Sequence, residues 1–190
     1  ATERIESRPE RRDTLADLER KALPQTDEEK EADRITHPQV GQLQALETKL
    51  AALRLANEVR SGARRPEPFA LDEAALPTAP DELNNIAFAL IDPERKEFGR
   101  EAEGLALARR AVSSAPATGD GRPAVTDTLA WALFANGLDE EALASSKAAL
   151  AAAPKERQVD YAGYLKELEA EIAAASGTEG TKAMEALTKQ

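Results

Sequence analysis

Two stretches of the chain carry small residues and a proline at the same spacing, and this spacing limits the folds available more than any other feature. The intervals are 4, 3 and 5 residues in Gly104, Ala108, Ala111 and Pro116, and again in Ala142, Ser146, Ala149 and Pro154. Small side chains three and four residues apart share one face of a helix, where they let a second helix approach closely. The spacing therefore predicts two helices that each cross a neighbour at short distance and end before a proline.

An apolar helix precedes each of these helices, so the two stretches are predicted to form helical hairpins. Ile86-Ala87 with Leu90 in the first unit corresponds to Leu129-Ala130 with Leu133 in the second. The second hairpin turns at Asn136-Gly137, where we expect Gly137 to end one helix and Asp139 to be the N-cap of the next. The first hairpin is less regular, with additional residues in the turn 92–100 and in the loop 117–123, which we interpret as a loop throughout.

The composition favours helices along the whole chain. Apolar residues make up 42%, aromatic residues only 4% and charged residues 32%. Alanine, leucine, glutamate, lysine and arginine dominate, and these side chains lose little rotamer freedom in a helix. Runs of β-branched and aromatic residues that would indicate strands are missing. We therefore predict an all-α fold, with two hairpins followed by a capping helix from Lys155 to Ala175.

Changes in composition divide the chain into four predicted parts. Residues 1–63 form charged helices, and residues 64–80 form a proline-rich linker with a short helical piece at Leu71–Leu76. Residues 81–175 hold the two hairpins and the capping helix, and residues 176–190 form a flexible tail in which Lys182–Lys189 can make a turn or two.

The N-terminal part contains a short leucine seam. His37-Pro38 predicts a helix break, and a helix follows from Gln39 to about Arg60 with leucines at intervals of 3, 4 and 3: Leu43, Leu46, Leu50 and Leu53. Asn57 continues this register at a position typical of a coiled-coil core. Two heptads suit either a helix packed along its own domain or a homodimer seam.

The hairpins resemble tetratricopeptide repeats, which are helical hairpins of about 34 residues that stack and bind other proteins. The second unit fits this pattern well, whereas 43 residues separate Ala87 from Ala130 in place of one regular repeat. More narrowly, residues 83–161 resemble the C-terminal repeat region of large bacterial serine/threonine kinases. The resemblance implies a regulatory or sensor segment with a kinase domain upstream. The absence of Met at Ala1 agrees with a processed chain or a piece of a longer one.

The resemblance also implies a binding face on the first helix of each hairpin. The positions that match the concave groove are Asn84, Phe88, Ile91, Asp127, Trp131 and Phe134. A protein or peptide is the expected partner, since aromatic anchors such as Trp131 dominate interface energies. Family members that bind the C-terminal carboxylate of a peptide hold it with basic residues and an asparagine. Phe88 and Thr128 stand at the expected positions here, so we do not expect a C-terminal carboxylate to bind. Two repeats are fewer than the three or so that a solenoid needs, so the helices of residues 1–63 could instead cover this groove.

No catalytic or cofactor motif is recognisable, so we expect a protein that is not an enzyme and needs no cofactor or metal. His37, the only histidine, precedes a proline and is interpreted as a solvated residue. The net charge of −10 argues against nucleic acid and anionic membranes, and the basic cluster at Arg8–Arg12 is interrupted by Glu10. No window approaches the length of a membrane span. The compartment stays open: cytoplasmic, or extracytoplasmic for the sensor segment of a membrane kinase.

Overall fold

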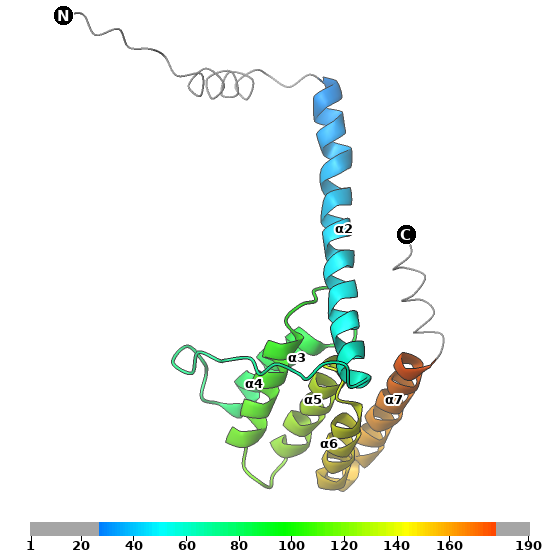
Figure 1. The fold of residues 1–190 in the computed structure, drawn as a ribbon. Coiled ribbons are helices and arrows are strands. Elements are labelled where there is room, and N and C mark those ends of the chain that lie inside the picture. The colour runs from blue at the N-terminus through cyan, green and yellow to red at the C-terminus, as the bar shows by residue number, and fades with distance from the viewer. Residues whose placement is uncertain (1–26, 178–190) are drawn as a thin grey trace, which may run out of the picture. The chain divides into compact units, whose positions relative to one another are not determined.

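The computed structural model describes residues 27–177, with side chains from Val40 onward, and these residues form helices and connecting loops (Figure 1). The α-helices are α2 (Asp27–Arg60), α3 (Pro80–Ile91), α4 (Glu101–Ser114), α5 (Gly121–Ala135), α6 (Asp139–Ala152) and α7 (Gln158–Ser176), and a 3₁₀ turn, η1, spans Lys155–Arg157. No strand occurs between residues 27 and 177. The predicted all-α class is confirmed. The basic cluster Arg8–Arg12 and the tail residues 178–190 lie outside the described part.

The chain divides into two units, residues 1–44 and residues 45–190. In the first unit the described part, residues 27–44, is helical. The predicted break at His37-Pro38 is wrong, because α2 is one helix from Asp27 to Arg60. The avoidance of helical dihedrals before proline is a bias rather than a rule, and the good helix formers further out, such as Glu28–Ala32 and Leu43–Ala56, continue the helix on both sides.

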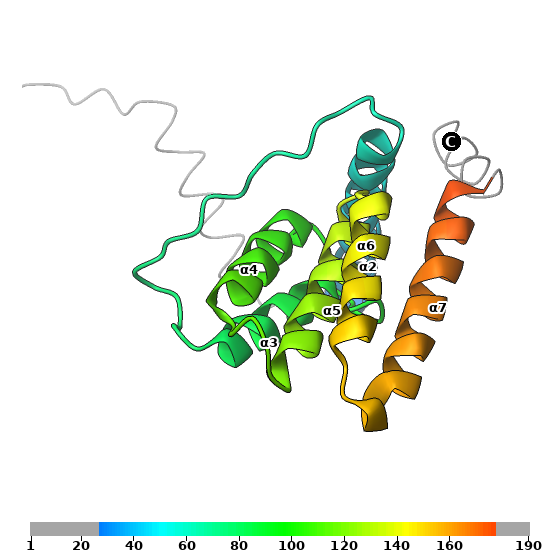
Figure 2. The same ribbon diagram turned by 90° about the horizontal axis from the view of Figure 1, so that it is seen from below.

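The second unit consists of two helical hairpins and a final helix. Each helix from α3 to α7 packs against the next one along the chain (Figure 2). In addition, α3 contacts α5, and α5 contacts α7. The first helices of successive hairpins therefore lie in one layer together with α7, and α4 and α6 form the other layer.

The helix crossings contain the small residues that the sequence predicted. Gly104, Ala108, Ala111, Ala142, Ser146 and Ala149 are all buried. At Gly104 a Cβ atom would lie 2.5 Å from Cγ2 of Ile91, so only glycine lets α4 approach α3 so closely. The core around these crossings contains Leu83, Ile91, Leu107, Leu133 and Leu168. Ile86, the large apolar residue that the spacing aligns with Leu129, is 41% exposed, whereas Ile91 at the end of α3 is buried.

Two helix starts differ from the sequence prediction. Helix α5 begins at Gly121 rather than after Pro123, because proline in a first turn lacks only an N–H that would have no helical partner. Arg122 then donates from Nη1 to the carbonyl oxygen of Val112 at 2.7 Å, which satisfies the end of α4. At α6 the N-cap is Leu138, without a side-chain hydrogen bond, and the carboxylate of Asp139 pairs with Arg60 instead.

The segment 61–79 runs around the outer side of α4 as a strap (Figure 2), and its residues 66–73 line a groove together with α4. Leu71 and Leu76 pack against the core, and Glu73 forms an ion pair of 3.2 Å with Arg110 of α4. The predicted short helix at Leu71–Leu76 is a turn at residues 73–75. The strap thus belongs to the second unit rather than serving as a free linker.

The turn between α5 and α6 lies directly against α2. Gly137 has a φ of +77°, and a Cβ atom there would overlap the carbonyl oxygen of Ala56. Ala56 is itself buried. Glycine is therefore needed at position 137 both for the left-handed backbone and for the approach of α2.

Replacing Gly137 with alanine is expected to lower the free energy of unfolding by about 2 kcal/mol or more. The left-handed conformation alone costs an L-residue about 1–2 kcal/mol, and the new methyl group also displaces Ala56. Urea unfolding followed by the emission of Trp131, the only tryptophan, measures the change. Gly163→Ala in α7 is the matched control, since a Cβ there meets nothing within 4 Å. Equal midpoints for the two variants would contradict the close approach.

Candidate functional site

A cavity of about 480 Å³ opens in the second unit, between α2, α5 and α7. One wall is the C-terminal part of α2, with Leu50, Leu53 and Ala56. The remaining lining includes Trp131 and Phe134 of α5, Ile91 of α3, and Glu171, Ala174 and Ala175 in the last turns of α7. The volume lies within the range of ligand pockets in proteins, and most of its lining is apolar. We call it the Trp131 cavity.

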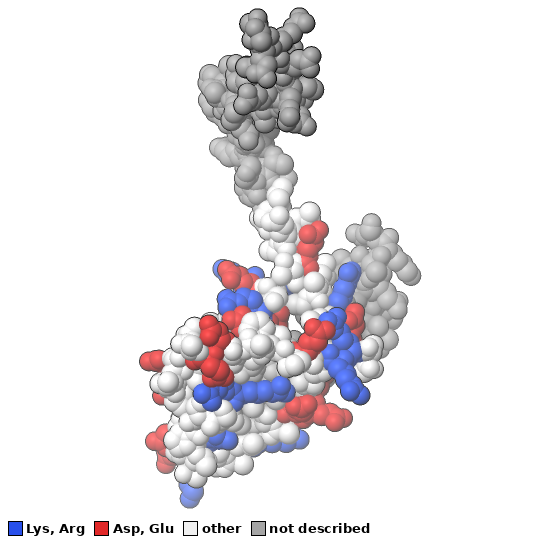
Figure 3. Space-filling model, turned by 60° about the vertical axis from the view of Figure 1, so that its left-hand side comes forward, with Lys and Arg blue, Asp and Glu red and all other residues white. Residues whose placement is uncertain are grey.

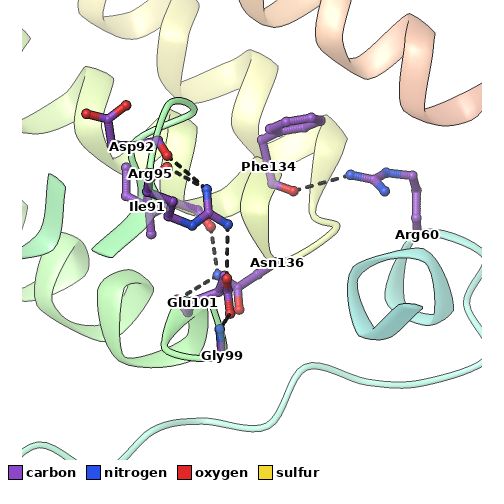
Figure 4. A network of polar contacts seen from close by, with 9 residues as sticks. Arg60, Ile91, Asp92, Arg95, Gly99, Glu101, Phe134 and Asn136 are labelled. Atoms are coloured by element: carbon purple, nitrogen blue, oxygen red, sulfur yellow. Dashed lines mark hydrogen bonds and ion pairs between the residues drawn. The ribbon is translucent and has the colours of Figure 1, made fainter. Parts of the chain in front are cut away.

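Arg60 attaches α2 to the second hairpin. Its Nε donates to Oδ2 of Asp139 at 2.6 Å. Its Nη2 donates to the carbonyl oxygen of Phe134 at 3.3 Å (Figure 4). Its Nη1 donates to Oδ1 of Asn57 at 2.7 Å. Asn57, the asparagine in the register of the leucine seam, therefore forms a hydrogen bond within its own helix. The guanidinium also lies 5.3 Å from the Phe134 ring centroid. Both side chains of the Arg60–Asp139 pair are mostly buried, so the pair fixes the distance between α2 and the hairpin turn.

The long turn between α3 and α4 forms the rest of the rim. Arg95 donates from Nη2 to Glu101 at 3.0 Å and from Nη1 to the carbonyl oxygens of Ile91 and Asp92 (Figure 4). Glu101 also accepts from the backbone N–H of Gly99. Phe98 lies between two cations: Arg95 is 4.4 Å and the Lys49 ammonium 5.1 Å from its ring centroid. The additional residues of this turn therefore build a contact to α2.

The six residues predicted for the binding face separate into two groups. Ile91, Trp131 and Phe134 line the Trp131 cavity. Trp131 is only 6% exposed, and its ring meets that of Phe134 edge to face with centroids 6.1 Å apart. Asn84 is half-buried with its Oδ1 buried and without a hydrogen-bond partner, and Phe88 is 40% exposed. These two residues and Asp127 do not line the cavity.

Asp127 lies on the side of α5 that faces α7. Burial of its carboxyl, with a smaller contribution from the negative charge of Glu167, raises its pKa to about 6. Burial likewise raises the pKa of Tyr161 on α7. A carboxylate that is half-buried and near a second acid is costly to ionise. Asp127 therefore makes the packing of α7 against α5 sensitive to pH.

Comparison with protein-family models, with curated proteins and with solved structures gave no match. The site must therefore be interpreted from its own geometry. Within residues 27–177, every helix is too short or too polar to cross a membrane. In the same part of the chain, acidic and histidine side chains nowhere gather in a group of three that could hold a metal ion. On the face shown in Figure 3, basic and acidic side chains are mixed.

Several residues of the site were not predicted from the sequence. Lys49, Arg60, Arg95 and Phe98 contribute to the rim, and Glu171, Ala174 and Ala175 of α7 contribute to a wall. The additional residues in the turn 92–100 are the sequence signal for Arg95 and Phe98, because this turn carries both. The sequence also allowed the helices of residues 1–63 to cover the groove. In the structure, residues 49–60 of α2 line the cavity but do not fill it.

Asp127→Asn is expected to stabilise the protein near neutral pH. A folded-state pKa of about 6 lies above the ordinary 3.8, so the fold disfavours the charged form and gains stability as the pH falls through about 6 towards 4. At about pH 7.5 the variant should unfold with a free energy about 1–3 kcal/mol higher than the parent, and the difference should vanish near pH 4. Urea titrations at several pH values measure this. Asp120→Asn, in an exposed loop, removes the same charge as a control; a pH-independent effect of Asp127→Asn would contradict the prediction.

Proposed function

We propose that the chain is a non-catalytic protein-interaction module of tetratricopeptide-like helical hairpins, in which the Trp131 cavity receives apolar side chains of a peptide. The cavity carries this proposal. It presents Trp131 and Phe134 from one helix layer opposite leucines of α2, and aromatic residues in a desolvated pocket are typical anchors of protein interfaces. Its concave, mostly apolar lining with a few polar groups at the rim is the usual form of a binding site.

The rim charges support an acidic rather than a basic peptide. Lys49, Arg60 and Arg95 border the cavity, against Glu171 as the acid in its lining. Arg60 and Arg95 already hold Asp139 and Glu101, whereas Lys49 contacts the Phe98 ring and forms no ion pair with a carboxylate among residues 40–177. A carboxylate beside the inserted apolar residue would pair with Lys49.

In this proposal the module is a regulatory or sensor segment of a larger bacterial protein such as a serine/threonine kinase. The support is the resemblance of residues 83–161 to the repeat region of those kinases, together with the hairpin architecture of α3–α6. Chemistry would then belong to another part of the larger protein. This segment would contribute the binding surface.

Selection from a random peptide library tests the cavity directly. Peptides enriched on the full chain are expected to carry a bulky apolar residue next to an acidic one and to change the emission of Trp131 on binding. Leu53→Glu should weaken these peptides at least about tenfold, which is about 1.4 kcal/mol, because Leu53 lines the cavity. Leu55→Glu is the matched control on the same helix, since Leu53 and Leu55 are 43% and 41% exposed and Leu55 does not line the cavity. Peptides that bind both variants equally would refute the cavity as the site.

The second candidate function is homodimerisation through Leu43, Leu46, Leu50 and Leu53. It is favoured by the exposure of large apolar side chains on α2, among them Leu46 at 58%. It is opposed by the position of Leu50 and Leu53 in the wall of the Trp131 cavity and by the bond between Asn57 and Arg60.

Sedimentation over a roughly hundredfold range of protein concentration tests the dimer. A seam dimer should dissociate on dilution, and Leu43→Glu with Leu46→Glu should abolish it because buried charges oppose the apolar seam. Leu55→Glu, outside the seam register, should leave it intact. A species that stays monomeric over the whole range would exclude this function.

A further inference from the structure

We propose that α7 is a releasable wall of the Trp131 cavity, and that protonation of Asp127 on α5 fastens it. Asp127 and Glu167 of α7 place two carboxyl groups at the contact between these helices, and the last turns of α7 line the cavity. In its consequence for binding the proposal rests on the proposed function: a partner peptide would meet a complete site in acid and a loosened one at neutral pH.

Helix α7 can separate from the array without disturbing the other helices. It is the last described helix and lies at the edge of the array, where it packs against α5, α6 and η1 (Figure 2). Of its 19 residues only Tyr161 and Leu168 are buried, whereas α5 buries eight of 15 residues. Elements with few buried contacts open locally at a lower free energy than the whole domain unfolds. We therefore expect α7 to open as a unit of its own.

The helical register places the acidic pair next to the cavity. Asp127 precedes Trp131 by four residues on α5, and Glu167 precedes Glu171 by four residues on α7. Residues four apart share one face of a helix and lie one turn apart. Trp131 and Glu171 both line the cavity. The acidic pair therefore lies on the same helix faces as the cavity lining, about one turn away.

Asp127 has no partner that would compensate its negative charge. Among residues 40–177 its carboxylate accepts no hydrogen bond and forms no ion pair. The titratable groups that face it are Glu167 and Tyr161, both of α7, and no charged group in α3, α4 or α6 interacts with it. Arg157, just before α7, pairs with Asp160 instead. The ionised carboxylate therefore opposes the packing of α7, through its own desolvation and through repulsion from Glu167.

The direction of the pH effect follows from the raised pKa of Asp127. With α7 in place this pKa is about 6, against the ordinary 3.8, so the packed state retains a proton that the released state gives up. Helix α7 is held most firmly below about pH 4, and this contribution is lost as the pH rises through about 6. The two pKa values imply that the equilibrium constant for release rises about tenfold between pH 5 and pH 8.

Hydrogen exchange of the full chain at several pH values measures this release. After correction for intrinsic exchange, the opening constants of the amides in α7 are expected to exceed those in α4 at every pH. They should rise about tenfold from pH 5 to pH 8 in the parent chain and stay constant in Asp127→Asn. Equal opening constants for α7 and α4 would overturn the inference, and so would α7 constants that do not vary with pH in the parent chain.

Two glutamates of α7 provide a matched pair of variants. Glu167→Gln should lower the α7 opening constant at pH 8 about twofold or more, because it removes the repulsion of Asp127. Glu169→Gln removes an equal charge from an exposed position of the same helix that does not interact with Asp127, and it should leave the opening constant unchanged. Equal effects of the two variants would assign the control of α7 to net charge and contradict the role of the acidic pair.

Addition of a library-selected peptide separates this inference from the proposed function. A peptide at about ten times its Kd should lower the α7 opening constant about tenfold, because it binds the complete cavity and not the released form. A peptide that binds without any change in α7 opening would refute the releasable wall and leave the binding module standing. A pH-dependent opening of α7 without any peptide that binds would instead support the releasable wall and refute the proposed partner.

Discussion

The close approach of Ala56 in α2 to Gly137 in the turn between α5 and α6 determines the rest of the site. A side chain at position 137 would overlap the Ala56 carbonyl, and the backbone there has a positive φ. Because the two backbones meet, Arg60 one turn further along α2 reaches both Asp139 and the carbonyl oxygen of Phe134. The same approach brings Leu50 and Leu53 of α2 into the lining of one cavity with Trp131. A bulkier turn would separate α2 from the hairpins and remove one wall.

Polar groups near this contact link the hairpins as well as α2. Asn136 donates from Nδ2 to the carbonyl oxygen of Glu101 at 2.9 Å and to that of Ala132 at 2.8 Å, so the turn after α5 is bonded to the first residue of α4 (Figure 4). Glu101 in turn holds Arg95. These bonds join residues of different elements, Asn136 after α5 and Arg95 of the long turn each to Glu101 of α4. The network therefore couples the position of α2, through the hairpin turn, to the long turn that completes the rim.

The sequence predicts the parts of this structure that follow from local spacing. Small residues at intervals of four and three identified the buried crossings, because the helical period alone places Ala108 and Ala111 on one face. The same period could not decide between Ile86 and Ile91, since the choice depends on how far α3 is rotated against α4 at Gly104. Asp139 was expected to cap its helix, but the nearby Arg60 competes for the carboxylate, and that pairing spans 79 positions of sequence. The cavity was not predictable, because its walls come from α2, α5 and α7.

The cavity stays open because many of the side chains that line it are alanines. The lining includes Ala52, Ala56, Ala135, Ala174 and Ala175. A helix that covers an apolar groove permanently is expected to bring leucine or phenylalanine to these positions, since close packing without voids is the rule in protein interiors. Ala56 is small because the hairpin turn lies against it. No such contact explains Ala174 and Ala175, which border the cavity from the α7 side. In the proposed function these small residues keep space for the side chains of a partner.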